Sequence, residues 1–402
     1  MFDDEGGAVV FLASFAAKVS ASALQLGKIG SPTMDRRLDD MHSSSWSSQI
    51  PSFSEDTKKK TSKRNDYKRS EISTMVTSVL TTAALRAKYL TNTAYARAFS
   101  TQRTVVVVGA TSGIGNACAH RLAQQGFQVL AVGRHREGRA EELVQALTES
   151  SRENGTESPA HEFYSCDAFS LKSVQDTAQK ISQKHQSIDA LVMTQGMATM
   201  QGFTPTPDGN DQKLTLHYYS RVAMAQCLLP ALQKSNMPAV ILSVLSGGVH
   251  GPYTKYEEDP SLQKNYSIRN AADAAGYYND LGFDSFARKN SSLIVAHACP
   301  GFVNTNWGTE FPSLLRGFVR LLQPFGRSPM DCADYLLSAT VLAQETGNPL
   351  PDRPNGNTEG LYIVGQYGES SSLTKQHTPE ARDSIWKHTV DVLGKAGIVV
   401  EP

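Results

Sequence analysis

The most constraining feature of this sequence is a glycine-rich segment that joins a short apolar run to an amphipathic stretch. Val105–Val108 is β-branched throughout, as in a buried parallel strand, and apolar residues recur at helical spacing from Ile114 to Leu122. The joining segment reads Gly109-Ala110-Thr111-Ser112-Gly113-Ile114-Gly115. Glycines let a backbone turn sharply and approach a pyrophosphate closely, and a helix N-terminus offers N–H donors with a partial positive charge. A strand, a glycine loop and a helix in this order favour a nucleotide-binding loop over a purely structural turn.

Further apolar runs repeat the alternation of strand and helix along the chain. Besides the first run, the strand-like segments are Gln128–Val132, Ala190–Met193, Val240–Val244, Leu293–Ala298 and Leu361–Val364. Helical patterns lie between them, which is typical of a parallel sheet with helices on both faces. We therefore predict an α/β fold, a Rossmann-type doubly wound parallel sheet that forms a single domain over residues 103–395.

Residues 1–102 differ in composition from the predicted domain. A serine cluster over residues 43–48 and a basic run over residues 58–69 would bury too little apolar surface to offset chain entropy, so we expect a disordered arm. Residues 75–103 contain arginine and lysine but no acidic residue, as in a mitochondrial transit peptide, although this segment does not begin the chain. The extension is therefore either a disordered linker or a targeting segment, and the location either cytoplasmic or mitochondrial.

Composition excludes several classes of protein. The chain has 39 basic and 39 acidic side chains, and this balance argues against a nucleic-acid partner, which usually requires a basic surplus. No uninterrupted apolar run reaches the roughly 18 residues of a membrane-spanning helix, so we expect none. Five widely spaced cysteines make neither a disulfide framework nor a metal site, and they fit a reducing compartment.

The end of the second strand predicts which nicotinamide cofactor the loop takes. A site that prefers NAD places an acidic residue there, about 20 residues after the glycine loop, to hold the ribose hydroxyls. This sequence has Arg134 instead, and no carboxylate beside it. A guanidinium can hold a 2′-phosphate through two hydrogen bonds, so the sequence predicts NADP(H).

From about residue 104 to residue 394 the chain resembles the short-chain dehydrogenase/reductase family, whose glycine spacing it shares. Within the family it is most similar to the retinol-dehydrogenase-like branch and its uncharacterised fungal and protist relatives. The resemblance implies that Asp167 contacts the adenine ring and that Thr305, in a Pro-Gly-Phe-Val-Asn-Thr segment, bonds the nicotinamide amide. Gly196 is the residue that matches the family's Asn-Asn-Ala-Gly stretch.

The same resemblance implies a catalytic set in which a serine polarises the substrate carbonyl and a tyrosine gives the proton. The serine is Ser246, after the strand Val240–Val244, and the tyrosine is Tyr266, at the start of a helix. The family's lysine, four residues after the tyrosine, lowers the pKa of the phenol, but here that position holds Asn270. The family's relay asparagine is replaced by His217, which is either a proton carrier or a packing residue.

Because Asn270 stands where the family has its lysine, the sequence leaves more than one function open. Tyr277 and Tyr278, later on the same helix, are runner-up proton donors, although at that spacing they are more typical of a core. The sequence predicts an NADP(H)-dependent oxidoreductase that interconverts a carbonyl and an alcohol. The alternatives are an NADP(H)-binding protein with little turnover, acting as a sensor or partner, and a purely structural module.

Two apolar segments near the C-terminus bear on the substrate and on assembly. By the family resemblance, the stretch from Phe311 to Phe325 covers the active site as a lid, which suits an apolar small-molecule substrate. With Arg316 and Arg320 on its polar side, this stretch alternatively rests on a membrane surface or packs on its own domain. The last helix has an apolar face, from Ile385 to Leu393, that is either core or the surface of a homodimer.

Overall fold

The computed structural model of the protein describes residues 102–135, 137–153, 159–306, 308–311, 313–343 and 349–400. The predicted arm lies outside these residues except for its last position, so its two alternatives stay predictions. No helix in the described ranges has the length and apolarity needed to cross a membrane.

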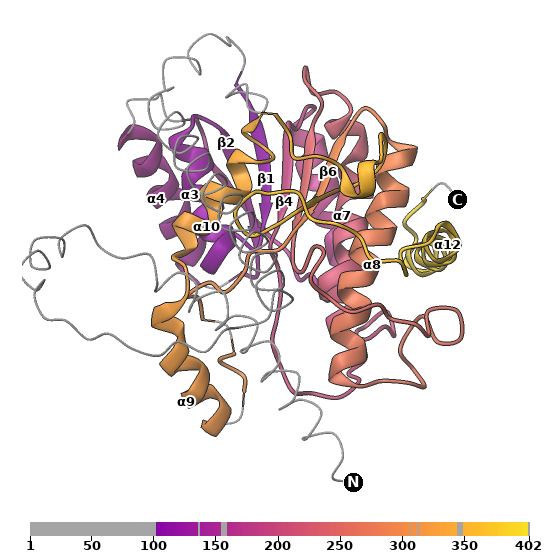
Figure 1. Ribbon diagram of the computed structural model, residues 1–402. Helices are drawn as coiled ribbons and strands as arrows, with labels where there is room; N and C mark the ends of the chain where they lie inside the picture. Colours follow the sequence, from indigo (N-terminus) through magenta and orange to yellow (C-terminus); the bar gives the residue numbers. More distant parts are fainter. Residues whose placement is uncertain are drawn as a thin grey trace, which may run out of the picture. The chain divides into compact units, whose positions relative to one another are not determined.

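A parallel sheet of seven strands organises the described part of the chain, in the order β3-β2-β1-β4-β5-β6-β7 (Figure 1). The strands are β1 (Thr104–Val108), β2 (Gln128–Gly133), β3 (Glu162–Ser165), β4 (Ala190–Met193), β5 (Val240–Val244), β6 (Ile294–Ala298) and β7 (Tyr362–Val364). The strand order reverses between β1 and β4, and in open α/β sheets ligands bind at such a switch point, beyond the carboxyl ends of the strands. The doubly wound parallel sheet is thereby confirmed.

Helices cover both faces of the sheet, and the period-two alternation of side chains explains why. Val105 and Val107 of β1 belong to one buried cluster, and Val106 and Val108 belong to the other. The first cluster includes residues of α3 (Gly113–Gln124), α4 (Arg139–Glu153) and α10 (Pro329–Ser338). The second includes residues of α5 (Leu171–Lys184), α7 (Ser220–Leu232), α8 (Ile268–Lys289) and α12 (Pro379–Lys395).

The helical segment from Gln212 to Leu232 is interrupted. It begins as the short α6 (Gln212–Leu214), widens to a π-helical turn over Thr215–Tyr219, and continues as α7. Such turns are rare and frequently occur at functional sites. This one contains His217.

The last helix shows how its apolar face is used. Ile385, Trp386, Thr389 and Leu393 of α12 are buried within the chain. This face is therefore core, and its alternative use as a dimer surface is not needed to explain its composition.

The segment expected to act as a lid forms α9 (Ser313–Leu322) and a short 3₁₀ turn, Gln323–Phe325. Figure 1 shows α9 and the first turns of α8 on the same side of the sheet, beyond the carboxyl ends of the strands. Val319 is buried, whereas Leu321 is 69% and Phe325 78% exposed. This segment thus packs partly on its own domain and presents apolar side chains to solvent, and its role as a lid stays a prediction.

Candidate active site

The glycine loop is built so that the first strand and first helix can approach each other closely. Gly109 and Gly113 have φ angles of +87° and +58°, a left-handed conformation that favours glycine. A Cβ on Gly115 would overlap the carbonyl of Gly109 and the hydroxyl of Thr194. These positions therefore require glycine for backbone reasons as well as for ligand approach.

The loop fits the diphosphate of a dinucleotide. Ser112 is the N-cap residue of α3 but makes no side-chain capping bond, and the first turn of α3 has no acidic residue. Thr305 lies against the loop, because its methyl carbon is 3.4 Å from the position that a Cβ on Gly113 would take. The helix N-terminus and Thr305 thus lie side by side at the switch point, as the predicted cofactor site requires. Thr111 and Ile114 lie in the same loop, and Thr111 packs against Gly133 at the end of β2.

Arg134 and Asp167 lie at the same corner of the sheet. Gly133 pairs with Ser165 at the ends of β2 and β3, and the Cys166 N–H donates to the Gly133 carbonyl at 2.9 Å. The side chains of Arg134 and Asp167, each one or two residues beyond these strands, are exposed. This corner is where the adenosine end of a dinucleotide would lie if its diphosphate is on the glycine loop.

His217 holds the segment that follows β4. Its Nε2 accepts a hydrogen bond from the Met197 N–H at 3.0 Å, and the same nitrogen is 3.5 Å from the position of a Cβ on Gly196. Burial, with the charges of Arg221 and Lys213, lowers the pKa of His217 to about 3. The ring is therefore neutral at physiological pH, and its contacts favour a loop anchor over a proton carrier.

Ser246 follows β5 and faces α8 at Gly276. A Cβ on Gly276 would stand 2.6 Å from the Ser246 Oγ and would overlap the ring of His250. The hydroxyl and this imidazole are therefore neighbours. The Ser246 N–H donates to His297 Nε2 at 3.2 Å, and this hydrogen bond holds the backbone of Ser246 in place.

Tyr266 lies two residues before α8 begins, and a lysine from another element contacts it. The Lys213 Nζ donates to the Tyr266 Oη at 2.7 Å, and the hydroxyl donates to the Gln201 carbonyl at 3.1 Å. Burial lowers the pKa of Lys213. Gly276, which faces Ser246, lies eight residues after the start of α8, or about 12 Å along the helix. The structure therefore does not bring Tyr266 next to Ser246.

The other predicted groups on α8 serve local structure. The side-chain amide of Asn270 donates to the Asn265 carbonyl at 2.7 Å. The Tyr277 hydroxyl donates to the Gln376 carbonyl, and the Tyr278 hydroxyl donates to the Pro260 carbonyl at 3.0 Å. Burial raises the pKa of both tyrosines well above the usual value. These contacts fit the core interpretation of the two tyrosines.

Comparison with known proteins gives the family. Residues 103–257 match the sequence profile described as short chain dehydrogenase. Oxidoreductase AN1596 of Emericella nidulans is 30% identical over 322 residues, which cover 73% of this chain and 93% of the relative. The chain belongs to the short-chain dehydrogenase/reductase family.

Two further likenesses agree with this result. The NmrA-like family domain-containing oxidoreductase notO of an Aspergillus species is 29% identical over 311 residues, 72% of this chain and 88% of the relative. A crystal structure from Mycobacterium Paratuberculosis has the same fold, with a TM-score of 0.52 and 19% identity over 75% of this chain and 96% of that one. This short-chain dehydrogenase/reductase is an oxidoreductase whose fold binds a nicotinamide cofactor. Its place in the retinol-dehydrogenase-like branch stays a prediction.

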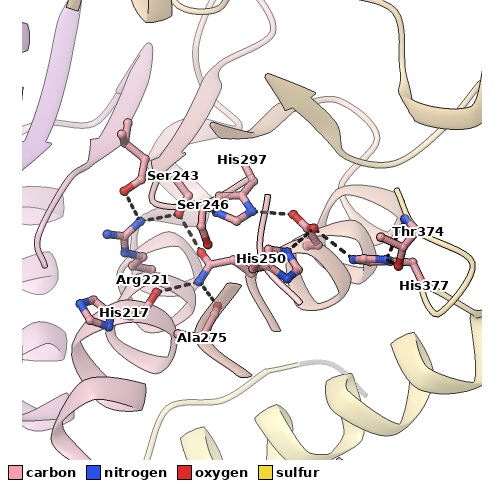
Figure 2. A network of polar contacts seen from close by, with 12 residues as sticks. His217, Arg221, Ser243, Ser246, His250, Ala275, His297, Thr374 and His377 are labelled. Carbon is pink, nitrogen blue, oxygen red and sulfur yellow. Dashed lines mark hydrogen bonds and ion pairs between the residues drawn. The ribbon is translucent and has the colours of Figure 1, made fainter. Parts of the chain in front are cut away.

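The sequence did not indicate several polar residues that gather around the end of β5 (Figure 2). Arg221 is fully buried and donates to the carbonyls of Gln195 and Val244, so it joins the ends of β4 and β5. The Asn279 amide donates to the His217 carbonyl at 2.7 Å and accepts from the Ser243 hydroxyl.

A buried carboxylate, Asp280, is the second missed group, and it contacts His250, His297 and His377. The signal that could have found this cluster is a polar residue inside an otherwise apolar element. His297 interrupts the apolar strand β6, and Asp280 lies on the buried side of α8. A buried charge requires hydrogen-bond partners, so a histidine and an aspartate in two buried elements are expected to contact each other.

Proposed function

We propose that this protein is an NADP(H)-dependent oxidoreductase that interconverts a carbonyl and an alcohol on an apolar small molecule. One observation carries the proposal. The carboxyl ends of the adjacent strands β1, β4 and β5 hold the glycine loop, Gly196 and Ser246 side by side. This arrangement puts a hydrogen-bond donor for a substrate oxygen next to a dinucleotide site.

The residues for the cofactor come from four strand ends. The N-terminus of α3 would hold the diphosphate, Thr305 the nicotinamide end, and Asp167 the adenine. Arg134, exposed beyond β2, would bind a 2′-phosphate, and this supports NADP(H) over NAD(H). The bound cofactor supplies or accepts a hydride.

The protein's own groups would handle the oxygen and its proton. The Ser246 hydroxyl would donate to the substrate oxygen and stabilise the negative charge that develops there. Tyr266 stays the proton donor that the family resemblance predicts, but the structure does not place it beside Ser246. The ammonium of Lys213 at its hydroxyl supports this role, because a nearby cation favours the tyrosinate as the family lysine would.

The lid supports an apolar substrate. Leu321 and Phe325 expose large apolar side chains on α9 and the turn after it, beyond the carboxyl edge of the sheet (Figure 1). Closure of such a segment over a bound molecule would bury these side chains against it and exclude water from the reacting atoms.

Cofactor titration and a turnover assay test the proposal together. We expect NADPH to bind more tightly than NADH, and Arg134→Ala to weaken NADPH binding by roughly ten- to a hundredfold, the value of a charge-assisted double hydrogen bond. Arg152→Ala, at the far end of α4, is the matched control and should not change binding. Equal affinity for the two cofactors would contradict the choice of NADP(H).

NADPH oxidation against apolar aldehydes and ketones then separates the two remaining functions. Turnover supports the oxidoreductase. Tight NADPH binding with no turnover of any carbonyl would favour the sensor or partner function that the loss of the family lysine suggested.

A further inference from the structure

A buried carboxylate, Asp280, receives hydrogen bonds from three histidines in the polar network that Figure 2 draws. Asp280 is fully buried on α8. Its Oδ2 accepts from the Nε2 atoms of His250 at 2.7 Å and His377 at 3.1 Å, and its Oδ1 accepts from His297 Nδ1 at 2.5 Å. Burial would raise the pKa of Asp280, but the hydrogen bonds that it accepts from these three rings hold it well below the usual value. Asp280 is therefore an anion, and the cluster must compensate its charge.

The hydrogen-bond partners of two of the rings match those of a neutral imidazole. His297 Nε2 accepts from the Ser246 N–H at 3.2 Å, so its proton is on Nδ1 and points to Asp280. His377 Nε2 faces Asp280, and its Nδ1 lies 3.2 Å from the Thr374 N–H and 2.8 Å from the Thr374 hydroxyl, contacts that a neutral ring with its proton on Nε2 satisfies. Each ring then has one nitrogen that accepts and one that donates a hydrogen bond, as a neutral imidazole does.

His250 differs because both of its nitrogens face acceptors. Nε2 faces Asp280 Oδ2, and Nδ1 faces the Gly251 carbonyl at 2.9 Å. A neutral ring would point a lone pair at one of these oxygens, whereas an imidazolium donates to both. Burial opposes the charge, but the hydrogen bond and charge of Asp280 outweigh it and raise the pKa of His250, with a further contribution from Asp273. Asp280 therefore has its counter-ion in His250.

The imidazolium lies beside the serine that would hold the substrate oxygen. Gly276 leaves room for both the Ser246 hydroxyl and the His250 ring at one point of α8. The neutral ring of His297 stands between the Ser246 N–H and the Asp280 carboxylate. Of the ion pair formed by His250 and Asp280, the cationic His250 is therefore the partner next to Ser246. The ring of His297 separates Asp280 from the Ser246 backbone.

We propose that His250 is a positioning residue that keeps a positive charge beside Ser246, and that this charge stabilises the negative charge developing on the substrate oxygen. The inference rests on the proposed function. It assigns His250 a cationic role at the serine, while Lys213 serves the tyrosine. The groups that face His250 are Asp280, Asp273 and Tyr277 of α8, His297 of β6, and His377 before α12.

The charge itself can be measured without turnover. Nitrogen NMR of the full chain labelled at histidine, with the His250 signals assigned by their loss in His250→Gln, reports the protons on each ring nitrogen. We expect both nitrogens of His250 to be protonated at pH 7, and His297, whose pKa burial lowers, to show one protonated and one bare nitrogen. A neutral His250 ring at pH 7 would overturn the inference, whatever the enzyme does with a carbonyl.

The pH dependence of carbonyl reduction tests the role of the charge. We expect kcat to be level below the pKa of His250 and to fall above it, and His250→Gln to lower kcat about a hundredfold at pH 7 and remove the inflection. His377→Gln removes another ring from the same carboxylate but leaves His250 in place, so the inflection should remain. A His250→Gln enzyme with the parent's pH profile would overturn the role. A parent chain that oxidises no NADPH would instead overturn the proposed function.

Discussion

Lys213 and Tyr266 form a pair that no local spacing in the sequence reveals, because 53 positions separate them. The phenol of a tyrosine has an ordinary pKa of about 10, and a cation at its hydroxyl favours the ionised form. The position that the family resemblance gives to the lysine holds Asn270, whose amide is engaged by the Asn265 carbonyl. The ammonium therefore reaches the tyrosine from α6 instead of from α8.

If Tyr266 exchanges the proton, Lys213→Met should change how alcohol oxidation depends on pH. Removing the ammonium raises the pKa of the phenol, so the rate should begin to rise at a higher pH, with about 1.4 kcal/mol lost for each pH unit of the shift. The measurement is kcat against pH with NADP. Lys264→Met, an exposed lysine two residues before Tyr266, is the control. A profile unaltered by both Lys213→Met and Tyr266→Phe would remove Tyr266 as the proton donor.

At the scale of elements, the approach of α3 to β1 depends on Gly115. Alanine normally stabilises a helix by up to about 1 kcal/mol relative to glycine. Here its methyl group would overlap the Gly109 carbonyl, so we expect Gly115→Ala to lower the free energy of unfolding by about 1–3 kcal/mol and to weaken cofactor binding. Gly394→Ala on α12, where a Cβ meets nothing within 4 Å, should be neutral or stabilising. Urea unfolding of both variants makes the comparison, and equal effects would contradict the close packing of the loop.

The strands that the sequence predicted are the ones with a strong local signal. Val105–Val108 and the other apolar runs are confirmed as buried parallel strands, because burial on both faces requires continuous apolar residues. Glu162–Ser165 was missed, since β3 is an edge strand with half-buried and polar side chains. The π-helical turn at Thr215–Tyr219 was missed as well, because one extra residue in a turn leaves no clear mark on an apolar pattern.

The candidate site also has one part with a local sequence signal and one part without such a signal. The cofactor loop is one contiguous segment with a physical reason for each glycine, so the sequence could predict it. The cluster around Asp280 draws His250, His297 and His377 from three segments, the last of them 97 positions away. Only the packed fold brings these side chains together.

For the whole molecule, buried histidines make stability depend on pH. His161, His217 and His297 each accept a backbone N–H, from Val129, Met197 and Ser246. Burial lowers the pKa of His161 to about 4 and that of His217 to about 3, and it also lowers the pKa of His297. His250 acts in the opposite sense. Its raised pKa gives stability that is present below about pH 6.5 and is lost as the pH rises through the folded-state value.

Between about pH 6.5 and pH 4, the unfolded chain takes up protons that these buried rings do not bind in the folded state. The free energy of unfolding should therefore decrease as the pH is lowered. A ring whose folded pKa is 4 or less contributes about 1.4 kcal/mol per pH unit, or about 2 kcal/mol by pH 5. His161→Gln should therefore make the decline between pH 7 and pH 5 shallower by about 2 kcal/mol. Urea unfolding at the two pH values measures it, with the exposed His135→Gln as the matched control. A decline that is equally steep in His161→Gln and in the parent would mean that the folded protein accommodates a protonated ring at this position.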